Sequence, residues 1–408
     1  MQILPASATR DARRLVAARA LRGLGDGLTS VLLPAYLLSL GRSAFEVGLL
    51  STAALVGSAL LTLAVGLASH RLAPRGVLLA ASALLLATGL GFAVATPYAW
   101  LLFVAFVGTM NPSGGDVSLF LPTEQALLVE TVDPAERTAL FSRYNVCAAL
   151  CVSLGALAAG APAWLAARLD TGFTSTARLA FAGYALLGVS TAICYAGLGI
   201  GRHAVSGAER ASASPRRALG ESRGIVLRLT ALFSLDSFGG GFALNSILVL
   251  WLLQRYALSL ERAGAVMSAA ALLSALSQLA SAPLARRIGL IPTMVFTHLP
   301  ANAFLIGAAF ASSASGAVMC LLARAALSQM DVPARQAYVM SVVRPEERAA
   351  AASVTNVPRS LASAASPTLA GALLQQSSFG WPLVAGGALK IAYDLLLLAG
   401  FRHRAPRV

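Results

Sequence analysis

The sequence predicts an all-α membrane protein whose twelve or so transmembrane helices form two pseudo-symmetric six-helix bundles. Three observations predict this fold class: the composition, the length of the apolar blocks, and an internal repeat. Of 408 residues, 57% are hydrophobic and only 12% are charged. A soluble domain would carry roughly 25% charged residues, so the composition favours a chain that lies mostly in lipid.

The apolar residues fall in blocks long enough to cross a hydrocarbon core of about 30 Å, which requires about 20 helical residues. Blocks such as 77–90 are continuously apolar and do not alternate with polar residues, which argues against a β-barrel. We expect spans at 17–40, 47–68, 76–95, 99–131, 138–165, 177–200, 225–253, 263–283, 290–311, 314–343, 349–376 and 381–400.

A polar stretch at 201–224 separates two sets of spans. It is rich in Gly, Ser, Ala and Arg, a composition typical of a linker and too polar to cross a membrane. We therefore predict an N-terminal six-helix bundle at 1–200, a cytoplasmic linker at 201–224, and a C-terminal six-helix bundle at 225–408.

The two halves repeat one another residue by residue. The first-half residues Pro122, Gln125, Glu136, Arg137 and Asn145 recur 211 positions later as Pro333, Gln336, Glu347, Arg348 and Asn356. So many coincidences at one offset indicate a duplicated six-helix unit, and parallel repeats of this kind are typical of secondary transporters. Within the repeat, we expect Asp133 to cap the fifth helix, with Glu136 completing a capping box.

The net charge of +14 is explained by the distribution of arginine. The side of the N-terminus holds 18 arginines in its predicted loops, the linker and the two termini, among them Arg71, Arg75, Arg137, Arg286, Arg287, Arg344 and Arg348. The opposite loops hold only Arg42, Arg168, Arg178, Arg255 and Arg262. This positive-inside bias places both termini in the cytoplasm and makes nucleic-acid binding an unnecessary hypothesis. Abundant arginine and alanine with little lysine suggest a bacterial source, and hence the inner (cytoplasmic) membrane.

The loop between the second and third predicted helices carries a partial family motif. It reads Gly66-Leu-Ala-Ser-His70-Arg71-Leu-Ala73-Pro74-Arg75. It resembles the Gly-x-x-x-Asp-Arg-x-Gly-Arg-Arg pattern of the major facilitator superfamily, with His70 in place of the Asp and Ala73 in place of the second Gly. The second-half counterpart puts Arg286 where the Asp belongs.

The fifth and eleventh helices carry a weaker resemblance. Gly155-Ala-Leu-Ala-Ala-Gly160-Ala-Pro162 and Ser366-Pro367-Thr-Leu-Ala-Gly371 partly match the Gly-Pro-x-x-Gly-Gly element of drug/proton antiporters in this superfamily. The resemblance implies that the first, fourth, seventh and tenth helices line a central cavity. It also implies a cytoplasmic gate, for which the candidates are Arg71, Arg75, Arg137, Arg287 and Arg348.

Ionisable residues inside the predicted spans are the candidate functional residues, because a charge near the bilayer centre costs at least about 2.5–3.5 kcal/mol. We expect one or two acids to be proton carriers, since a carboxyl group in a low-dielectric cavity can load and unload protons as access alternates. The proton-coupling candidates are Asp26, Asp116, Glu124, Asp236 and Asp331. The substrate-cavity candidates are Arg22, Asn111, Gln125, Asn245, Arg324, Gln329, Arg335 and Gln336.

A purely structural interpretation of the same charges stays open. Arg22 with Asp26, and Asp331 with Arg335, are spaced four residues apart and can form ion pairs on one helix. Lys390 and Asp394 on the last helix have the same spacing, and we interpret them as a pair that satisfies itself. We interpret His298, a lone histidine in the ninth predicted helix, as a packing residue.

The leading functional hypothesis is a secondary transporter that moves a small organic molecule by alternating access, as a proton-coupled exporter. The alternative is uptake or exchange of an organic anion through an Arg-lined cavity, and a third hypothesis is a sensor that does not transport. The sequence shows no nucleotide-binding loop, metal-ligand cluster or nucleophile triad, so we expect neither a cofactor nor an enzymatic activity. The expected partners are the substrate, the proton and the lipid bilayer, and we expect a monomer.

Overall fold

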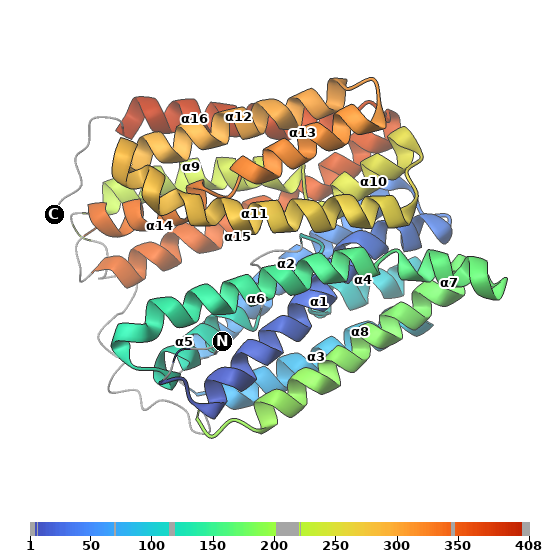
Figure 1. Ribbon diagram of the computed structural model, residues 1–408, viewed down its shortest axis with the longest axis horizontal. Coiled ribbons are helices and arrows are strands. Elements are labelled where there is room, and N and C mark those ends of the chain that lie inside the picture. Colours follow the sequence, from blue (N-terminus) through green and yellow to red (C-terminus); the bar gives the residue numbers. More distant parts are fainter. Residues whose placement is uncertain are drawn as a thin grey trace. The chain divides into compact units, whose positions relative to one another are not determined.

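The protein is helical throughout the part of the chain that the computed structural model describes, namely residues 5, 7–68, 71–113, 119–200, 220, 222–343 and 347–401. Within those residues the chain forms the helices α1 to α16 and two short 3-10 helices, and no β-strand (Figure 1). The all-α class predicted from the composition is therefore confirmed.

Two compact units make up the chain, and each contains one of the two predicted halves in large part. The first unit comprises Met1–Ser43, Ala53–Glu209 and Ser259–Ser268. The second comprises Ala44–Thr52, Arg210–Leu258 and Ala269–Val408. The boundary thus differs from the predicted one at α2 (Ala44–Ala68) and α11 (Leu260–Ile288), since the first residues of each helix group with the opposite unit. Most of the linker predicted at 201–224 lies outside the described residues.

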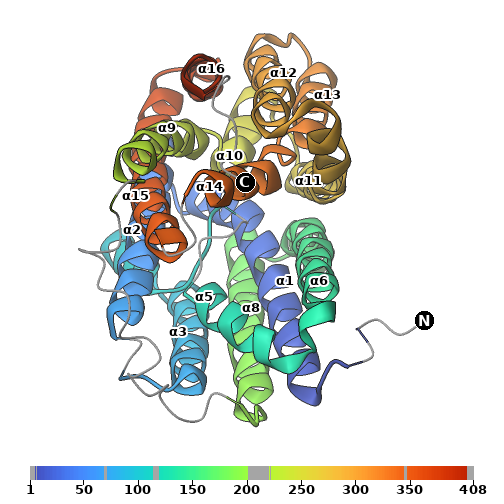
Figure 2. The same cartoon turned by 90° about the vertical axis from the view of Figure 1, so that its left-hand side faces the viewer.

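Besides part of α2, the first unit contains α1 (Arg10–Ser39), α3 (Pro74–Val94), α4 (Tyr98–Val107), α5 (Leu121–Leu128), α6 (Arg137–Ala158), α7 (Ala161–Leu169) and α8 (Phe173–Ala196). In both views α1 lies alongside α6 and α8, and α3 alongside α8 (Figures 1 and 2).

Besides part of α11, the second unit contains α9 (Arg223–Gly241), α10 (Asn245–Tyr256), α12 (Leu290–Phe310), α13 (Ala314–Leu327), α14 (Asp331–Val342), α15 (Arg348–Gln376) and α16 (Trp381–Phe401). Here α9 packs against α15 and α16, and α12 packs against α13, α14 and α16.

Glycines bring α1 and α6 into close backbone contact. A Cβ atom added to Gly27 would lie 2.0 Å from the carbonyl oxygen of Val152, and one added to Gly155 would lie 2.0 Å from that of Leu24. Small residues at such crossings are how helices gain packing energy in lipid, where there is no hydrophobic driving force between them. The small residues of the fifth predicted helix therefore have a packing function within the first unit.

Hydropathy alone detects only some of the predicted spans. Among the described residues, eight helices are long and apolar enough to cross a membrane. The remaining four predicted spans correspond to α1, α4 with α5, α13 with α14, and α15. α1 contains buried charges discussed below, the two pairs of short helices are interrupted spans, and α15 is rich in Ser, Thr and other polar residues; each of these lowers the apolar content of a window. With them, the eight complete the twelve spans expected from the sequence.

The fourth and tenth predicted spans are both interrupted. The fourth breaks between Val107 at the end of α4 and Leu121 at the start of α5, and the tenth breaks between Leu327 and Asp331. These breaks occupy equivalent places in the two repeats. Each creates a short helix, α5 or α14, that carries an ionisable side chain into the interior of its unit.

The repeated glutamates have a different role from the predicted cap. Asp133 makes no capping hydrogen bond with its side chain, so that prediction is wrong. Glu136 instead accepts hydrogen bonds from the backbone N–H (3.1 Å) and hydroxyl (2.5 Å) of Ser7, just before α1. Its repeat counterpart Glu347 likewise accepts from the backbone N–H groups of Gly220 (2.7 Å) and Ser222 (3.2 Å), just before α9. In both repeats the glutamate thus ties the end of this turn to the chain just ahead of the first helix.

Candidate functional site

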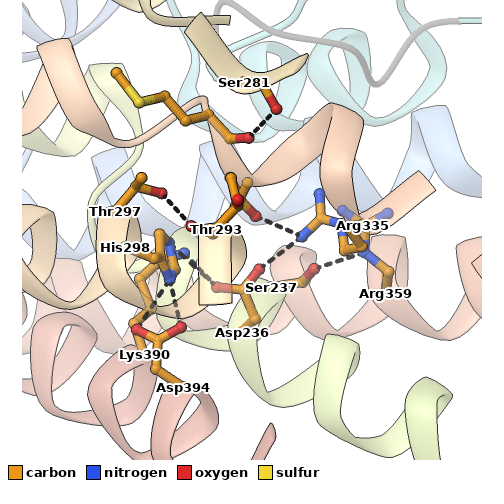
Figure 3. Close-up of polar contacts among 12 residues, drawn as sticks. Asp236, Ser237, Ser281, Thr293, Thr297, His298, Arg335, Arg359, Lys390 and Asp394 are labelled. Atoms are coloured by element: carbon orange, nitrogen blue, oxygen red, sulfur yellow. Dashed lines mark hydrogen bonds and ion pairs between the residues drawn. The ribbon is translucent and has the colours of Figure 1, made fainter. Parts of the chain in front are cut away.

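A group of ionisable side chains is buried in the second unit, and Asp236 of α9 lies at its centre (Figure 3). Asp236 Oδ1 accepts a hydrogen bond from Lys390 Nζ of α16 at 2.6 Å. Asp236 Oδ2 accepts one from Arg335 Nη1 of α14 at 3.1 Å. All three residues are less than one-tenth exposed. We call the group formed by Asp236, His298, Asn302, Asp331, Arg335, Lys390 and Asp394 the Asp236 cluster.

A histidine connects Asp236 to a second buried carboxylate. His298 of α12 has its Nδ1 3.0 Å from Asp394 Oδ1 and its Nε2 3.8 Å from Asp236 Oδ1. Asn302, one turn further along α12, donates from Nδ2 to Asp394 Oδ2 at 3.2 Å. Asp394 is fully buried on α16, so its charge depends on these two donors.

The helix crossing of α9 and α16 explains how Lys390 reaches Asp236. A Cβ atom added to Gly386 would lie 2.8 Å from the carbonyl oxygen of Gly239, so the two helices meet at these small residues. A Cβ atom at Gly239 would also lie 3.0 Å from Lys390 Cγ, so the absence of a side chain there leaves room for the lysine stem. The interpretation of Lys390 and Asp394 as a self-satisfying pair is therefore wrong, because each side chain finds its partner on another helix.

Arg335 holds two acids together. Its Nη1 lies 3.1 Å from Asp236 Oδ2 and 3.3 Å from Asp331 Oδ2, so the pair predicted from the four-residue spacing is formed. The guanidinium group also lies over the ring of Phe233, 5.6 Å from its centroid. Close by, Arg359 of α15 donates from Nε to the Ser237 hydroxyl at 3.2 Å (Figure 3).

The first unit contains a second buried group, centred on Glu124 of α5. Glu124 is fully buried and forms an ion pair with Arg22 of α1. Its two oxygens also accept hydrogen bonds from the hydroxyls of Tyr144 and Tyr195. The Arg22 guanidinium group lies over the ring of Phe120 at 4.3 Å. We call Arg22, Phe120, Glu124, Tyr144 and Tyr195 the Glu124 cluster.

Asp26 lies one turn along α1 from Arg22. Its Oδ2 is 3.9 Å from Arg19 Nη1, and both residues are buried. The sequence predicted an ion pair between Arg22 and Asp26, and the tertiary structure adds Glu124 and Arg19 as the close partners of these two residues.

The sequence and the fold of the chain resemble those of known membrane proteins. The sequence profile of the Major Facilitator Superfamily matches residues 15–328. The chain belongs to the major facilitator superfamily. Its members are membrane transporters, so the chain is a multi-pass membrane transport protein.

Solved structures of transporters share the fold over nearly the whole chain. The nucleoside transporter NupG is 12% identical, with a TM-score of 0.73, and the match covers 97% of this chain and 100% of that one. A bacterial homologue of the human lysosomal transporter Spinster is 15% identical, with a TM-score of 0.74 and 96% coverage of each chain. The xylose transporter XylE from E. coli is 16% identical, with a TM-score of 0.72, covering 96% of this chain and 98% of that one.

Among curated sequences, an uncharacterized membrane protein of Saccharomyces cerevisiae is 22% identical over 425 residues. The match covers 97% of this chain and 94% of the yeast protein. The similarity extends over both units.

The remaining predicted site residues of this superfamily member are scattered. Asn111 is buried, and its side-chain oxygen accepts a hydrogen bond from the backbone N–H of Ser113 at 3.1 Å. Gln125, Asn245, Arg324 and Gln329 are half-buried, Gln336 is exposed, and Asp116 lies outside the described residues. None of these residues belongs to either cluster, and a contact with substrate stays a prediction for them.

The predicted gate arginines lie mostly at the surface. Arg71, Arg137 and Arg287 are exposed, whereas Arg75 is half-buried and donates to the carbonyl oxygen of Ala196. The side chain of Arg348 lies outside the described residues. The gate assignment of these residues stays a prediction.

Sequence reasoning missed four members of the Asp236 cluster: His298, Asn302, Lys390 and Asp394. The superfamily pattern directed attention to the first, fourth, seventh and tenth helices, whereas these four residues lie on α12 and α16. The cost of burying a charge in lipid applies equally to Lys390 and Asp394, and that signal was sufficient to identify them. The tyrosines of the Glu124 cluster carried no such signal. Among the described residues, no group of three or more His, Cys, Asp or Glu could hold a metal ion.

Proposed function

We propose that this transporter is proton-coupled and exports a small organic molecule by alternating access. The observation that carries the proposal is the position of Asp236, which is buried between two cations on two other helices and faces an imidazole. A carboxylate in such surroundings can exchange one partner for another when it gains or loses a proton.

The ion pairs link protonation to helix arrangement. Lys390 and Arg335 tie α16 and α14 to α9 through the charge of Asp236. A proton on Asp236 removes that charge; Arg335 then keeps Asp331 as its partner, whereas Lys390 must find another one. Because a charge inside the membrane costs at least about 2.5–3.5 kcal/mol, the helices rearrange with the proton. Glu124, with Arg22 as its cation, is the corresponding candidate in the first unit.

Export is supported by the partial antiporter element in the fifth and eleventh predicted helices, described above. The arginine-rich loops support an orientation in which both termini are cytoplasmic, and we propose the bacterial inner membrane as the location. We propose that the protein acts as a monomer, since each unit contains its own cluster.

Proton coupling is tested on purified protein once a ligand has been found by a thermal-shift screen of small organic molecules. In liposomes that contain a pH-sensitive dye, we expect addition of that ligand to move protons in the wild type. D236N removes the charge at nearly constant volume and should abolish proton movement. D170N is the matched control, because Asp170 is an exposed residue at the end of α7.

The proposal is wrong if transport of the ligand into inverted vesicles is unchanged when the proton gradient is collapsed. It is also wrong if D236N moves as many protons per ligand as the wild type.

A second candidate function is uptake or exchange of an organic anion. It is favoured by Arg324 of α13, whose buried Nε atom has no hydrogen-bond partner among the described residues. A guanidinium group without a carboxylate beside it is suited to bind an anionic ligand. With a set of dicarboxylates and organic phosphates as probes, R324Q should lose the thermal shift that the wild type gives. R262Q, at an exposed position of α11, should retain it; an unchanged shift in R324Q excludes this function.

A further inference from the structure

The second unit carries a histidine, a lysine and an aspartate on helices where the first unit has none of these residue types. His298 lies on α12, and Lys390 and Asp394 lie on α16. The corresponding helices of the first unit are α3 and α8, third and sixth in the repeat. Their described residues include no Asp, Glu, His or Lys. These three side chains therefore distinguish the second repeat from the first.

Both ring nitrogens of His298 face a carboxylate. Nδ1 lies 3.0 and 3.1 Å from the two oxygens of Asp394, and Nε2 lies 3.8 Å from Asp236 Oδ1. A neutral imidazole has one N–H group and therefore leaves one nitrogen lone pair pointing at a carboxylate. Adding one proton to this set of three groups removes that repulsion, so the geometry favours holding a proton here.

One oxygen atom of Asp236 is shared by two possible donors. Lys390 Nζ is 2.6 Å from Oδ1 and holds it, whereas His298 Nε2, at 3.8 Å, is just beyond hydrogen-bond length. The other oxygen, Oδ2, is occupied by Arg335. A protonated imidazole that moves closer to Oδ1 would therefore compete with Lys390 for the same atom.

The charges around the imidazole come from each neighbouring helix. Asp236 on α9 and Asp394 on α16 face it directly, and the ring of Tyr393 on α16 lies edge-on with its centroid 6.1 Å away. Lys390, Arg335 and Asp331 lie behind Asp236. Arg359 on α15 and Arg324 on α13 interact with Asp236 electrostatically. The cations thus act on His298 through Asp236, whereas the two carboxylates act on it directly.

We infer that His298 and Asp394 form a proton-binding site, and that the proton is sensed through competition between His298 and Lys390 for Asp236 Oδ1. This inference rests on the proposed proton coupling and adds to it a relay on α12 and α16, outside the helices expected to line the cavity. Asn302 is a positioning residue, because its amide nitrogen lies 3.2 Å from both Asp394 Oδ2 and His298 Nδ1 and so fixes these two groups against each other.

The test is a titration of His298 by ¹⁵N NMR on the full chain in lipid nanodiscs. The sequence has four histidines, and the variant H70Q/H203Q/H403Q leaves His298 as the single one. In this background the ¹⁵N shifts of the single imidazole report its protonation state, which is followed from about pH 5 to 8. D394N removes a facing negative charge and should shift the midpoint to lower pH by about one unit or more.

Two further variants are expected to behave differently from D394N: one should shift the midpoint in the opposite direction, and the other should shift it little. K390Q frees Asp236 Oδ1 for the imidazole and should shift the midpoint to higher pH. D331N removes an acid of the same cluster that contacts Arg335 and not His298, so the midpoint should move much less than in D394N. These two variants retain His298 and Asp394 and still decide the inference if D394N fails to fold.

The inference is overturned if His298 keeps one protonation state over this range, or if D394N and D331N shift the midpoint equally. A separate measurement distinguishes this failure from failure of the proposed function. If the wild type moves no protons with its ligand, proton coupling itself is wrong. If the wild type is coupled and H298Q moves the same number of protons per ligand with an unchanged pH profile, only the relay is wrong.

Discussion

The two buried clusters share one repeat position, and it carries opposite charge in the two units. Glu124 in the first unit and Arg335 in the second are 211 residues apart and thus equivalent, so one repeat places an acid where the other places a base. Their partners are reversed as well: the base Arg22 is on the first helix of its repeat, and the acid Asp236 is on the first helix of its own. Each repeat therefore has an ion pair between its first helix and its short helix α5 or α14, but the acid and the base are exchanged between the two repeats.

The clusters differ more in what surrounds the acid. Glu124 is held by one cation and two tyrosine hydroxyls, which supply hydrogen bonds without a second charge. Asp236 is held by two cations and faces a histidine. Removing the single cation beside a buried acid leaves its charge uncompensated, whereas an acid with several cations can exchange one for another. The difference indicates that the Glu124 cluster keeps one fixed ion pair, whereas the ion pairs of the Asp236 cluster can rearrange.

The largest expected effect separates the two arginines. Arg22 is the only cation within ion-pair distance of Glu124 in the described part of the chain, so R22M leaves a buried charge uncompensated. We expect a loss of about 3–5 kcal/mol in the free energy of unfolding. The double variant R335M/D331N removes Arg335 together with its second acid, leaves Asp236 with Lys390, and should cost clearly less. Denaturant unfolding of the two purified variants measures the difference, and equal losses would contradict the comparison.

A smaller effect is expected at the helix crossings. In G27A the new methyl group would lie 2.0 Å from a backbone oxygen of α6, so α1 must move away at a cost of about 1–3 kcal/mol. In G239A the new methyl group would lie 3.0 Å from the flexible Lys390 stem and 3.1 Å from the carbonyl oxygen of Gly386, so a much smaller displacement than in G27A relieves both contacts. G239A should therefore unfold at nearly the wild-type temperature but weaken the ion pair of Lys390 with Asp236. Thermal unfolding of both variants tests this, and a lower midpoint for G239A than for G27A would argue against it.

The smallest effect concerns two buried tyrosines. Y195F removes a hydroxyl that donates to the charged Glu124, and we expect it to cost about 1–2 kcal/mol. Y393F is the matched control, because the Tyr393 hydroxyl is buried without a hydrogen-bond partner among the described residues. That variant should be neutral or slightly stabilising. If both variants lose the same stability, the hydroxyl at Tyr195 does not support Glu124.

Many residues of this site could be predicted from the sequence, because two simple arguments identify them: the energetic cost of a charge inside an apolar span, and the spacing of residues along one helix. A charged side chain in an apolar span needs a reason, and that argument identified Arg22, Glu124, Asp236 and Arg335. The four-residue spacing predicted the contact of Asp331 with Arg335, which lie on one face of α14. The same spacing predicted an ion pair between Lys390 and Asp394 that does not form. Helical spacing identifies neighbours on one helix and gives no information about carboxylates on other helices.

The sequence by itself determined the helical membrane fold, its internal repeat and the interruption of the fourth span, because composition and periodicity are local properties of the chain. Only the tertiary structure decided which cation forms an ion pair with which acid. Lys390 binds Asp236 because Gly239 and Gly386 let α9 and α16 cross closely enough for the lysine to reach across. His298 became part of the site because α12 brings it between two carboxylates that are far apart in the sequence.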